Sequence, residues 1–127
     1  MSEAQSTGNP DPAGLVPLTP AVLAILLALA DGEKHGYAIM QAAAAAGGGA
    51  PMGPGTLYGS LDRMLRARLV AESDGPDETG GHAGSRRYYR LTEFGRRVLQ
   101  AEIRRLEQTL ALARRKKLAG RRRAVAS

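Results

Sequence analysis

Residues 54–68 carry hydroxyl and guanidinium side chains that could contact a nucleic acid: Thr56, Tyr58, Ser60, Arg63 and Arg66. Guanidinium groups bind phosphates and guanine edges, and hydroxyl groups hydrogen-bond to phosphate oxygens. A second set of the same residue types follows further along the chain: Ser85, Arg86 and Arg87. These residues predict contact with a polyanion, provided that the fold brings the two sets to one surface.

A helix over residues 54–68 would present the first set. Pro54 suits a first helical turn, and apolar residues follow at helical spacing: Leu57, Leu61, Met64 and Leu65. If that stripe packs inward, four residues face outward at about 100° per residue: Thr56, Gly59, Arg63 and Arg66. Such a face could enter a major groove about 12 Å wide. For this helix taken alone, an ordinary solvated face is an equal alternative.

The basic side chains are concentrated in the last third of the chain. The net charge is +6, and residues 86–127 hold 14 Lys and Arg against three Asp and Glu. This asymmetry favours a polyanionic partner, although a solvated basic tail would give the same count.

The composition argues against other classes of function. There is no cysteine, and His35 and His82 lack the spacing of metal ligands, so we predict neither a metal nor a cofactor. No nucleophile–base grouping is visible, and Gly47 to Gly49 lack the Lys-Ser/Thr of a phosphate loop, so we predict no enzyme. The apolar run 22–30 is shorter than the about 20 residues that cross a bilayer, so we expect a cytoplasmic protein without membrane contact.

The chain fits one domain with two tails, mainly α with a small β-hairpin. We predict a disordered leader at 1–17, a winged helix-turn-helix at 18–91, a helix at 92–117 and a basic flexible tail at 118–127. Within the domain the predicted elements are helices over 19–30, 34–46 and 54–68 and strands over 69–73 and 86–91. Tyr37 falls on the apolar side of its helix, so we expect it to pack inward. Tyr88 and Tyr89 should point to opposite faces of their strand.

The final helix carries a coiled-coil seam with 4-3-4-3 spacing: Leu99, Ile103, Leu106, Leu110 and Ala113. A small domain could cover only the start of this helix. Burial of the remainder predicts a homodimer in which residues 92–117 form the dimerisation helix.

Four blocks resemble the PadR-type transcriptional regulators: Leu18-Thr19, His35-Gly36-Tyr37, Pro54 to Tyr58 with Leu61 and Arg63, and Arg87 to Gly95. The similarity covers about residues 15–115. Because only one helix follows the winged domain, the chain resembles the short subfamily, whose members have a single C-terminal helix. It implies a homodimeric repressor that binds double-stranded DNA at an inverted-repeat operator. It also implies a small hydrophobic effector, whose identity no residue pattern in this sequence indicates.

Two departures from the family pattern modify the expected contacts. The loop after the first strand holds Asp74, Asp77 and Glu78, which phosphates would repel, so we place the wing contacts at Ser85, Arg86 and Arg87. Gly59 stands where the family often has a basic or bulky residue, which favours recognition of DNA shape. A protein-interaction adaptor that docks through the C-terminal helix is the alternative function.

Overall fold

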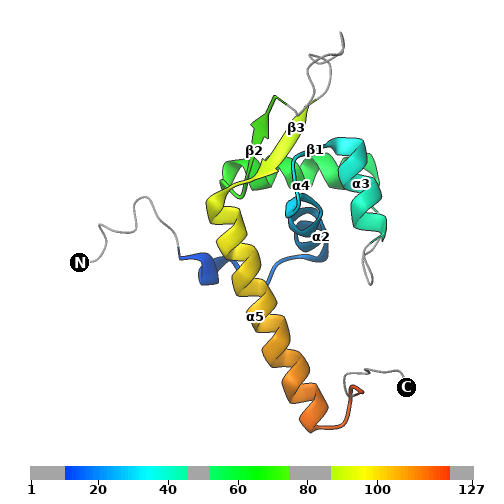
Figure 1. Ribbon diagram of the computed structural model, residues 1–127, viewed down its shortest axis with the longest axis vertical. Coiled ribbons are helices and arrows are strands. Elements are labelled where there is room, and N and C mark those ends of the chain that lie inside the picture. Colours follow the sequence, from blue (N-terminus) through cyan, green and yellow to red (C-terminus); the bar gives the residue numbers. More distant parts are fainter. Residues whose placement is uncertain (1–10, 46–51, 75–86, 121–127) are drawn as a thin grey trace, which may run out of the picture.

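The computed structural model describes residues 11–45, 52–74 and 87–120 of the protein. It is mainly helical with one small sheet, which confirms the predicted fold class (Figure 1). The elements in chain order are η1 (Pro12–Leu15), α2 (Pro20–Leu29), β1 (Lys34–His35), α3 (Gly36–Ala45), α4 (Pro54–Arg66), β2 (Val70–Ser73), β3 (Tyr88–Leu91) and α5 (Glu93–Arg115).

Helix α2 is the centre of the core. Thr19 caps it, because its Oγ1 accepts a hydrogen bond from the Val22 N–H at 3.2 Å, and Pro20 fits the first turn. The helix is apolar on most sides, and Ile25 and Leu26 have no exposed surface. It contacts α3, α4 and α5, so each of these helices is positioned against it (Figure 1).

The predicted disordered leader extends too far along the chain. Residues 12–15 form η1, which packs against α5, and the Asp11 carboxylate accepts a hydrogen bond from the Ala13 N–H at 3.1 Å. Val16 and Leu18 pack against the core cluster. The many Pro, Gly and polar residues of the predicted leader hid the contact of Val16, whereas Leu18 lies within the predicted domain. Residues 1–10 of the predicted leader and 121–127 of the predicted tail lie outside the described residues.

The sheet has three antiparallel strands in the order β1-β3-β2. The predicted hairpin is present as β2 and β3, and β1 adds the pairs Lys34 to Tyr89 and His35 to Tyr88. A two-residue strand is too short to show alternation in the sequence. Tyr89 is buried and Tyr88 is half-buried against the His35 ring, as expected of neighbours on one strand.

Thr92 and Gly95 fasten the start of α5 to the domain. Thr92 Oγ1 accepts a hydrogen bond from the Gly95 N–H at 2.8 Å and lies 2.7 Å from the Arg68 carbonyl oxygen. Gly95 is buried, and a Cβ there would lie 2.9 Å from the Leu69 carbonyl carbon. Only glycine therefore allows α5 to lie this close to the turn between α4 and β2.

Glu102 ties the segment before α2 to the middle of α5. Its side chain is 1% exposed, and its Oε2 accepts a hydrogen bond from the Leu18 N–H at 3.4 Å. Arg105 Nε donates to Oε1 at 2.8 Å. The hydrogen bond from Arg105 lowers the pKa of the Glu102 carboxyl, although burial acts in the opposite direction. The buried charge is therefore compensated where α5 leaves the domain.

Helix α4 ends at Arg66, earlier than the predicted Arg68, in a Schellman motif. The Leu69 N–H donates to the Met64 carbonyl at 2.9 Å and the Arg68 N–H to the Leu65 carbonyl at 3.0 Å. Arg68 has a φ of 64°, a left-handed conformation that glycine adopts without penalty. An arginine here is therefore strained.

Arg68→Gly should raise the free energy of unfolding by about 1 kcal/mol, because it removes the left-handed strain. Urea denaturation measures the change. The same Arg→Gly substitution at Arg63, inside the helix, should lower the free energy by about 1 kcal/mol. Destabilisation by both substitutions would show that Arg68 carries no strain that glycine relieves.

Candidate nucleic-acid interface

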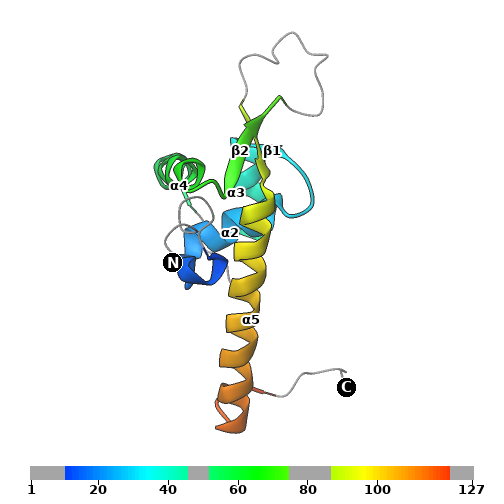
Figure 2. The same cartoon turned by 90° about the vertical axis from the view of Figure 1, so that its left-hand side faces the viewer.

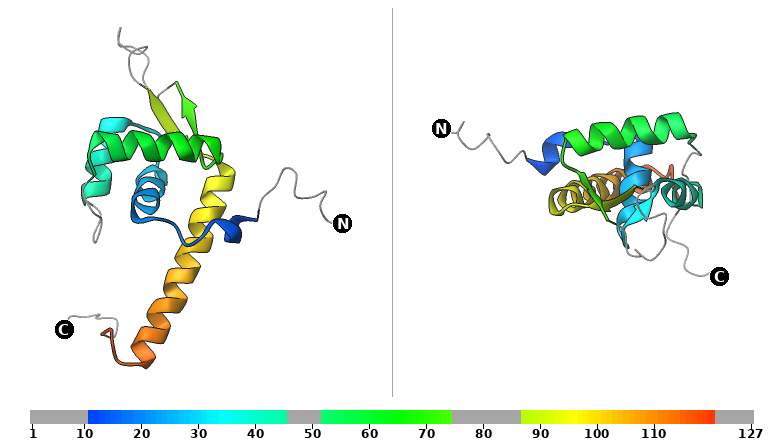
Figure 3. Two further views of the ribbon diagram at one scale, coloured as in Figure 1. Left: turned by 180° about the vertical axis from the view of Figure 1, so that it is seen from behind. Right: turned by 90° about the horizontal axis from the view of Figure 1, so that it is seen from above.

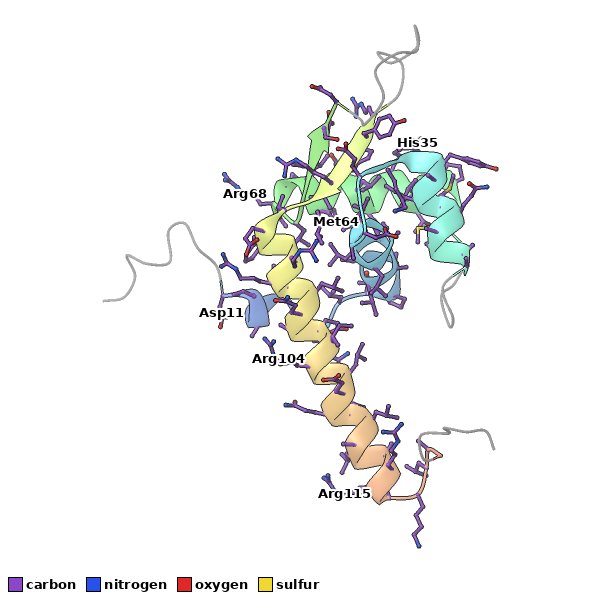
Figure 4. The ribbon with its side chains drawn as sticks, in the orientation of Figure 1. Asp11, His35, Met64, Arg68, Arg104 and Arg115 are labelled. Carbon is purple, nitrogen blue, oxygen red and sulfur yellow. The ribbon has the colours of Figure 1, made fainter. Side chains whose placement is uncertain are left out.

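Helix α4 lies on one side of the domain with its apolar stripe inward, as predicted. Leu57, Leu61 and Met64 are at most 1% exposed, and Met64 points into the domain (Figure 4). In the view from behind, none of the other described helices and strands covers the outer side of α4 (Figure 3). Figure 2 shows the helix end-on beside β2, with α5 leading away from both. The outer side of α4 is therefore open to a large partner.

The structure brings most of the predicted α4 contacts to this open side. Thr56, Arg63 and Arg66 are exposed, and Tyr58 is 48% exposed. Arg66 Nη1 lies 2.6 Å from Asp62 Oδ2, an acidic neighbour that the sequence reasoning left out. In the described part of the chain, Arg63 forms no ion pair. Its positive charge is therefore not neutralised by a carboxylate there.

Ser60 was wrongly included among the contact residues. It is 1% exposed, because it lies on the same side of α4 as Leu57 and Met64. Its Oγ accepts a hydrogen bond from Arg63 Nη2 at 3.4 Å. Ser60 can hold the Arg63 guanidinium, but it cannot itself reach an external ligand.

Tyr58 joins α4 to the start of α3, and Arg87 lies at the base of the hairpin. A Cβ at Gly36 would lie 2.8 Å from Tyr58 Cζ, so the phenol occupies space that only glycine leaves free. Arg87, exposed just before β3, has its guanidinium pKa raised first by a hydrogen bond with Tyr89. The negative charge of Glu72, whose Oε2 lies 3.4 Å from Arg87 Nη1, adds to this increase. Arg87 is therefore held at the base of the hairpin by an ion pair with β2, the strand that packs against α4.

Tyr37 is not a core residue, contrary to the prediction. It is 61% exposed. Helix α3 begins at Gly36, after the β1 strand, and His35 Nδ1 accepts a hydrogen bond from the Ala38 N–H at 3.3 Å. The buried residues of α3 are Gly36, Ile39 and Ala43, so Tyr37 lies beside the buried stripe and not on it. Tyr37 instead places an exposed aromatic ring at the N-terminal end of α3, next to Gly36, which contacts Tyr58.

Two predicted wing contacts, Ser85 and Arg86, lie outside the described residues, as does most of the acidic loop. Arg87 is described and exposed. In the parts of the chain with a described structure, no group of three acidic or histidine side chains could hold a metal ion. Over the same residues, no helix has both the length and the apolar character needed to span a membrane.

The predicted seam on α5 divides into a covered part and an open part. Leu99 is 6% exposed and belongs to the core of its own domain, so its assignment to a dimer interface is corrected. Ile103, Leu106 and Ala113 are half-buried, and Leu110 is 41% exposed. The second half of α5 extends away from the domain (Figure 1). The side chains of Arg104 and Arg115 both project from the same side of α5 (Figure 4).

Helices α3 and α4, followed by the β2–β3 hairpin, define a winged helix-turn-helix protein, with α4 in the position of the recognition helix. The sequence agrees with this class. Residues 25–101 match the family described as "Transcriptional regulator PadR-like family". The chain therefore belongs to the PadR-like family of transcriptional regulators.

Individual proteins are similar at the level of fold and sequence. A PadR family transcription regulator from Clostridium difficile is 21% identical, with a TM-score of 0.64, over 76% of this chain and 97% of that one. RosR from H. salinarum is 28% identical, with a TM-score of 0.55, over 77% and 79%. An uncharacterized 37.1 kDa protein in transposon TN4556 of Streptomyces fradiae is 40% identical over 82 residues, which are 65% of this chain and 21% of that protein. The chain thus matches about a fifth of the length of this relative.

Proposed function

We propose that the protein regulates transcription by binding duplex DNA, with α4 in the major groove and the base of the β2–β3 hairpin on the adjacent backbone. The observation that carries this proposal is the open side of α4, where Thr56, Tyr58, Arg63 and Arg66 are exposed. Arg87 is exposed at the base of the hairpin, whose strand β2 packs against α4. Arginines can read guanine edges, and hydroxyl and guanidinium groups bind phosphates.

The backbone of α4 supports a close approach to the bases. Gly55 and Gly59 carry no side chain on its outer side, and a Cβ at Gly55 would have no neighbour within 4 Å. Small residues at these points let a helix enter the groove deeply. Among the described residues no carboxylate pairs with Arg63, so its charge would add attraction to the DNA.

We propose that two copies act together as a homodimer. The support is the open half of α5, where Leu106, Leu110 and Ala113 form an apolar line that leads away from the domain. A second copy would cover this line and place its own α4 in a major groove about 34 Å away, on an inverted-repeat operator. Such a dimer would act as a repressor where its operator overlaps a promoter.

A small hydrophobic effector is part of the same proposal. A groove of about 200 Å³ lies between the segment before α2 and the end of α4, lined mainly by apolar side chains that include Leu15, Val22 and Met64. Arg63 also lines it. A molecule in this groove would lie against a proposed DNA-contacting side chain and could therefore weaken DNA binding.

The roles of Arg63 and Arg87 can be separated by competition between a selected duplex and random duplexes. Arg63→Ala should cost about 1 to 3 kcal/mol for the selected duplex and relax its base preference. Arg87→Ala should weaken both duplexes alike and reduce the slope of log affinity against log salt by about one. Arg104→Ala, on α5, is the matched control and should change neither. If the Arg63 and Arg87 variants bind like the wild type, α4 is not the reading helix.

A protein-interaction adaptor is the second candidate. It is favoured by Leu110, Leu112 and Leu118, which are 41%, 45% and 78% exposed. An adaptor would bind random and selected duplexes equally, so the same competition experiment distinguishes the two functions.

A further inference from the structure

Asp62 lies in the middle of the outer side of α4, where DNA would meet the helix on the function proposed above. The buried residues of α4 are Leu57, Ser60, Leu61 and Met64. At about 100° per residue, the positions most nearly opposite to this buried arc are 55, 59, 62 and 66. Two of these are glycines. The side chains that project from the centre of this face are therefore those of Asp62 and Arg66.

The two side chains form one unit. Arg66 Nη1 donates to Asp62 Oδ2 at 2.6 Å, and the side chains are 67% and 63% exposed. Gly55 and Gly59 leave open space beside them: a Cβ at Gly55 would have no neighbour within 4 Å, and one at Gly59 would find only Arg63 Nη1 at 3.8 Å. The pair thus projects from an otherwise bare stretch of backbone.

A carboxylate at this place needs an explanation, because it repels phosphates and lowers the general affinity for DNA. The ion pair fixes the guanidinium of a long, flexible side chain and uses one of its terminal nitrogens. The remaining nitrogens can still donate to O6 and N7 of guanine, while a carboxylate can accept from the amino group of cytosine. An acidic partner therefore reduces non-specific attraction and aims the arginine at one base pair.

We infer that Asp62 is a specificity-determining residue: it positions Arg66 to read a G·C pair and penalises binding to unselected sequences. This inference rests on the proposed function. It differs from an ordinary surface ion pair, such as Glu93 with Arg97 on α5, in predicting opposite changes for the two kinds of DNA.

The test uses the full chain with its selected duplex, a set of duplexes carrying single base-pair changes, and random duplex DNA. Asp62→Asn keeps the shape of the side chain and removes its charge. We expect its affinity for random duplex to rise about two- to fivefold, and its preference at one G·C pair to fall about tenfold or more. Arg66→Lys keeps the positive charge but loses the planar group, so it should lose the same preference. Glu107→Gln, an exposed charge change on α5, should affect neither quantity.

The outcomes separate this inference from the proposed function. A wild-type protein without base preference would overturn both. If the wild type discriminates and Asp62→Asn discriminates equally at every position, only the role of Asp62 is overturned. The thermal unfolding midpoint of each variant is measured alongside, and Asp62→Glu, which retains the carboxylate, should keep more of the preference than Asp62→Asn. Equal losses in the two variants would also contradict the inference.

Discussion

Leu110→Glu is expected to lower the affinity for the selected duplex by about 10² to 10⁴-fold while the domain stays folded. Leu110 is 41% exposed and does not belong to the buried core cluster, so a charge there should leave the core intact. In the proposed homodimer, however, the substitution would bury a charge between two helices. Separated copies would then bind each half-site alone and lose the benefit of two linked contacts.

Leu112→Glu is the matched control. Leu112 is 45% exposed, and it lies about 200° around the helix from Leu110, away from the proposed interface. Analytical ultracentrifugation should find the Leu110 variant monomeric and the Leu112 variant dimeric at concentrations where the wild type is a dimer. A dimeric Leu110 variant, or equal losses of DNA affinity in the two variants, would contradict the proposed dimer.

Gly95→Ala should lower the free energy of unfolding by about 3 kcal/mol, at the upper end of the range for overpacking. Its Cβ would lie 2.9 Å from the Leu69 carbonyl carbon and overlap the carbonyl oxygen. A backbone group cannot rotate away as a side chain can, so α5 must move away from the turn. That movement would also disturb the hydrogen bonds of Thr92.

The comparison for this prediction is Gly59→Ala on the outer side of α4. Its added methyl group would meet only Arg63 Nη1, at 3.8 Å, and alanine favours a helix interior by about 1 kcal/mol. Urea denaturation should therefore show opposite signs for the two Gly→Ala changes. Stability of the Gly95 variant within about 0.5 kcal/mol of the wild type would mean that α5 does not need this close approach.

Local signals were sufficient to predict most of the helices. The Thr19-Pro20 start of α2, the Thr92 cap of α5 and the apolar stripe of α4 each depend on neighbours along the chain. The β1 strand and η1 could not be predicted in this way. They are two and four residues long, and they are stabilised by β3 and α5, which lie far away in the sequence.

In the candidate site, too, features that depend on neighbours along the chain could be predicted, and features that depend on distant residues could not. Exposure of Thr56, Arg63 and Arg66 follows from helical spacing, whereas the place of Arg87 relative to α4 depends on how the hairpin packs. Ser60 was misassigned because its residue type was weighed without its angular position. Asp62 was not considered, because the predicted stripe included Leu65 and so placed the centre of the outer face nearer to Arg63 than to Asp62.

A hydroxyl-radical footprint of the best-selected genomic fragment tests most directly whether two copies of α4 read one duplex. We expect two protected half-sites related by a dyad, with centres about 10 base pairs, or a multiple of that, apart. The protection should weaken in the Arg63→Ala variant. Failure to select any fragment over random DNA, or a footprint without dyad symmetry, would contradict the account.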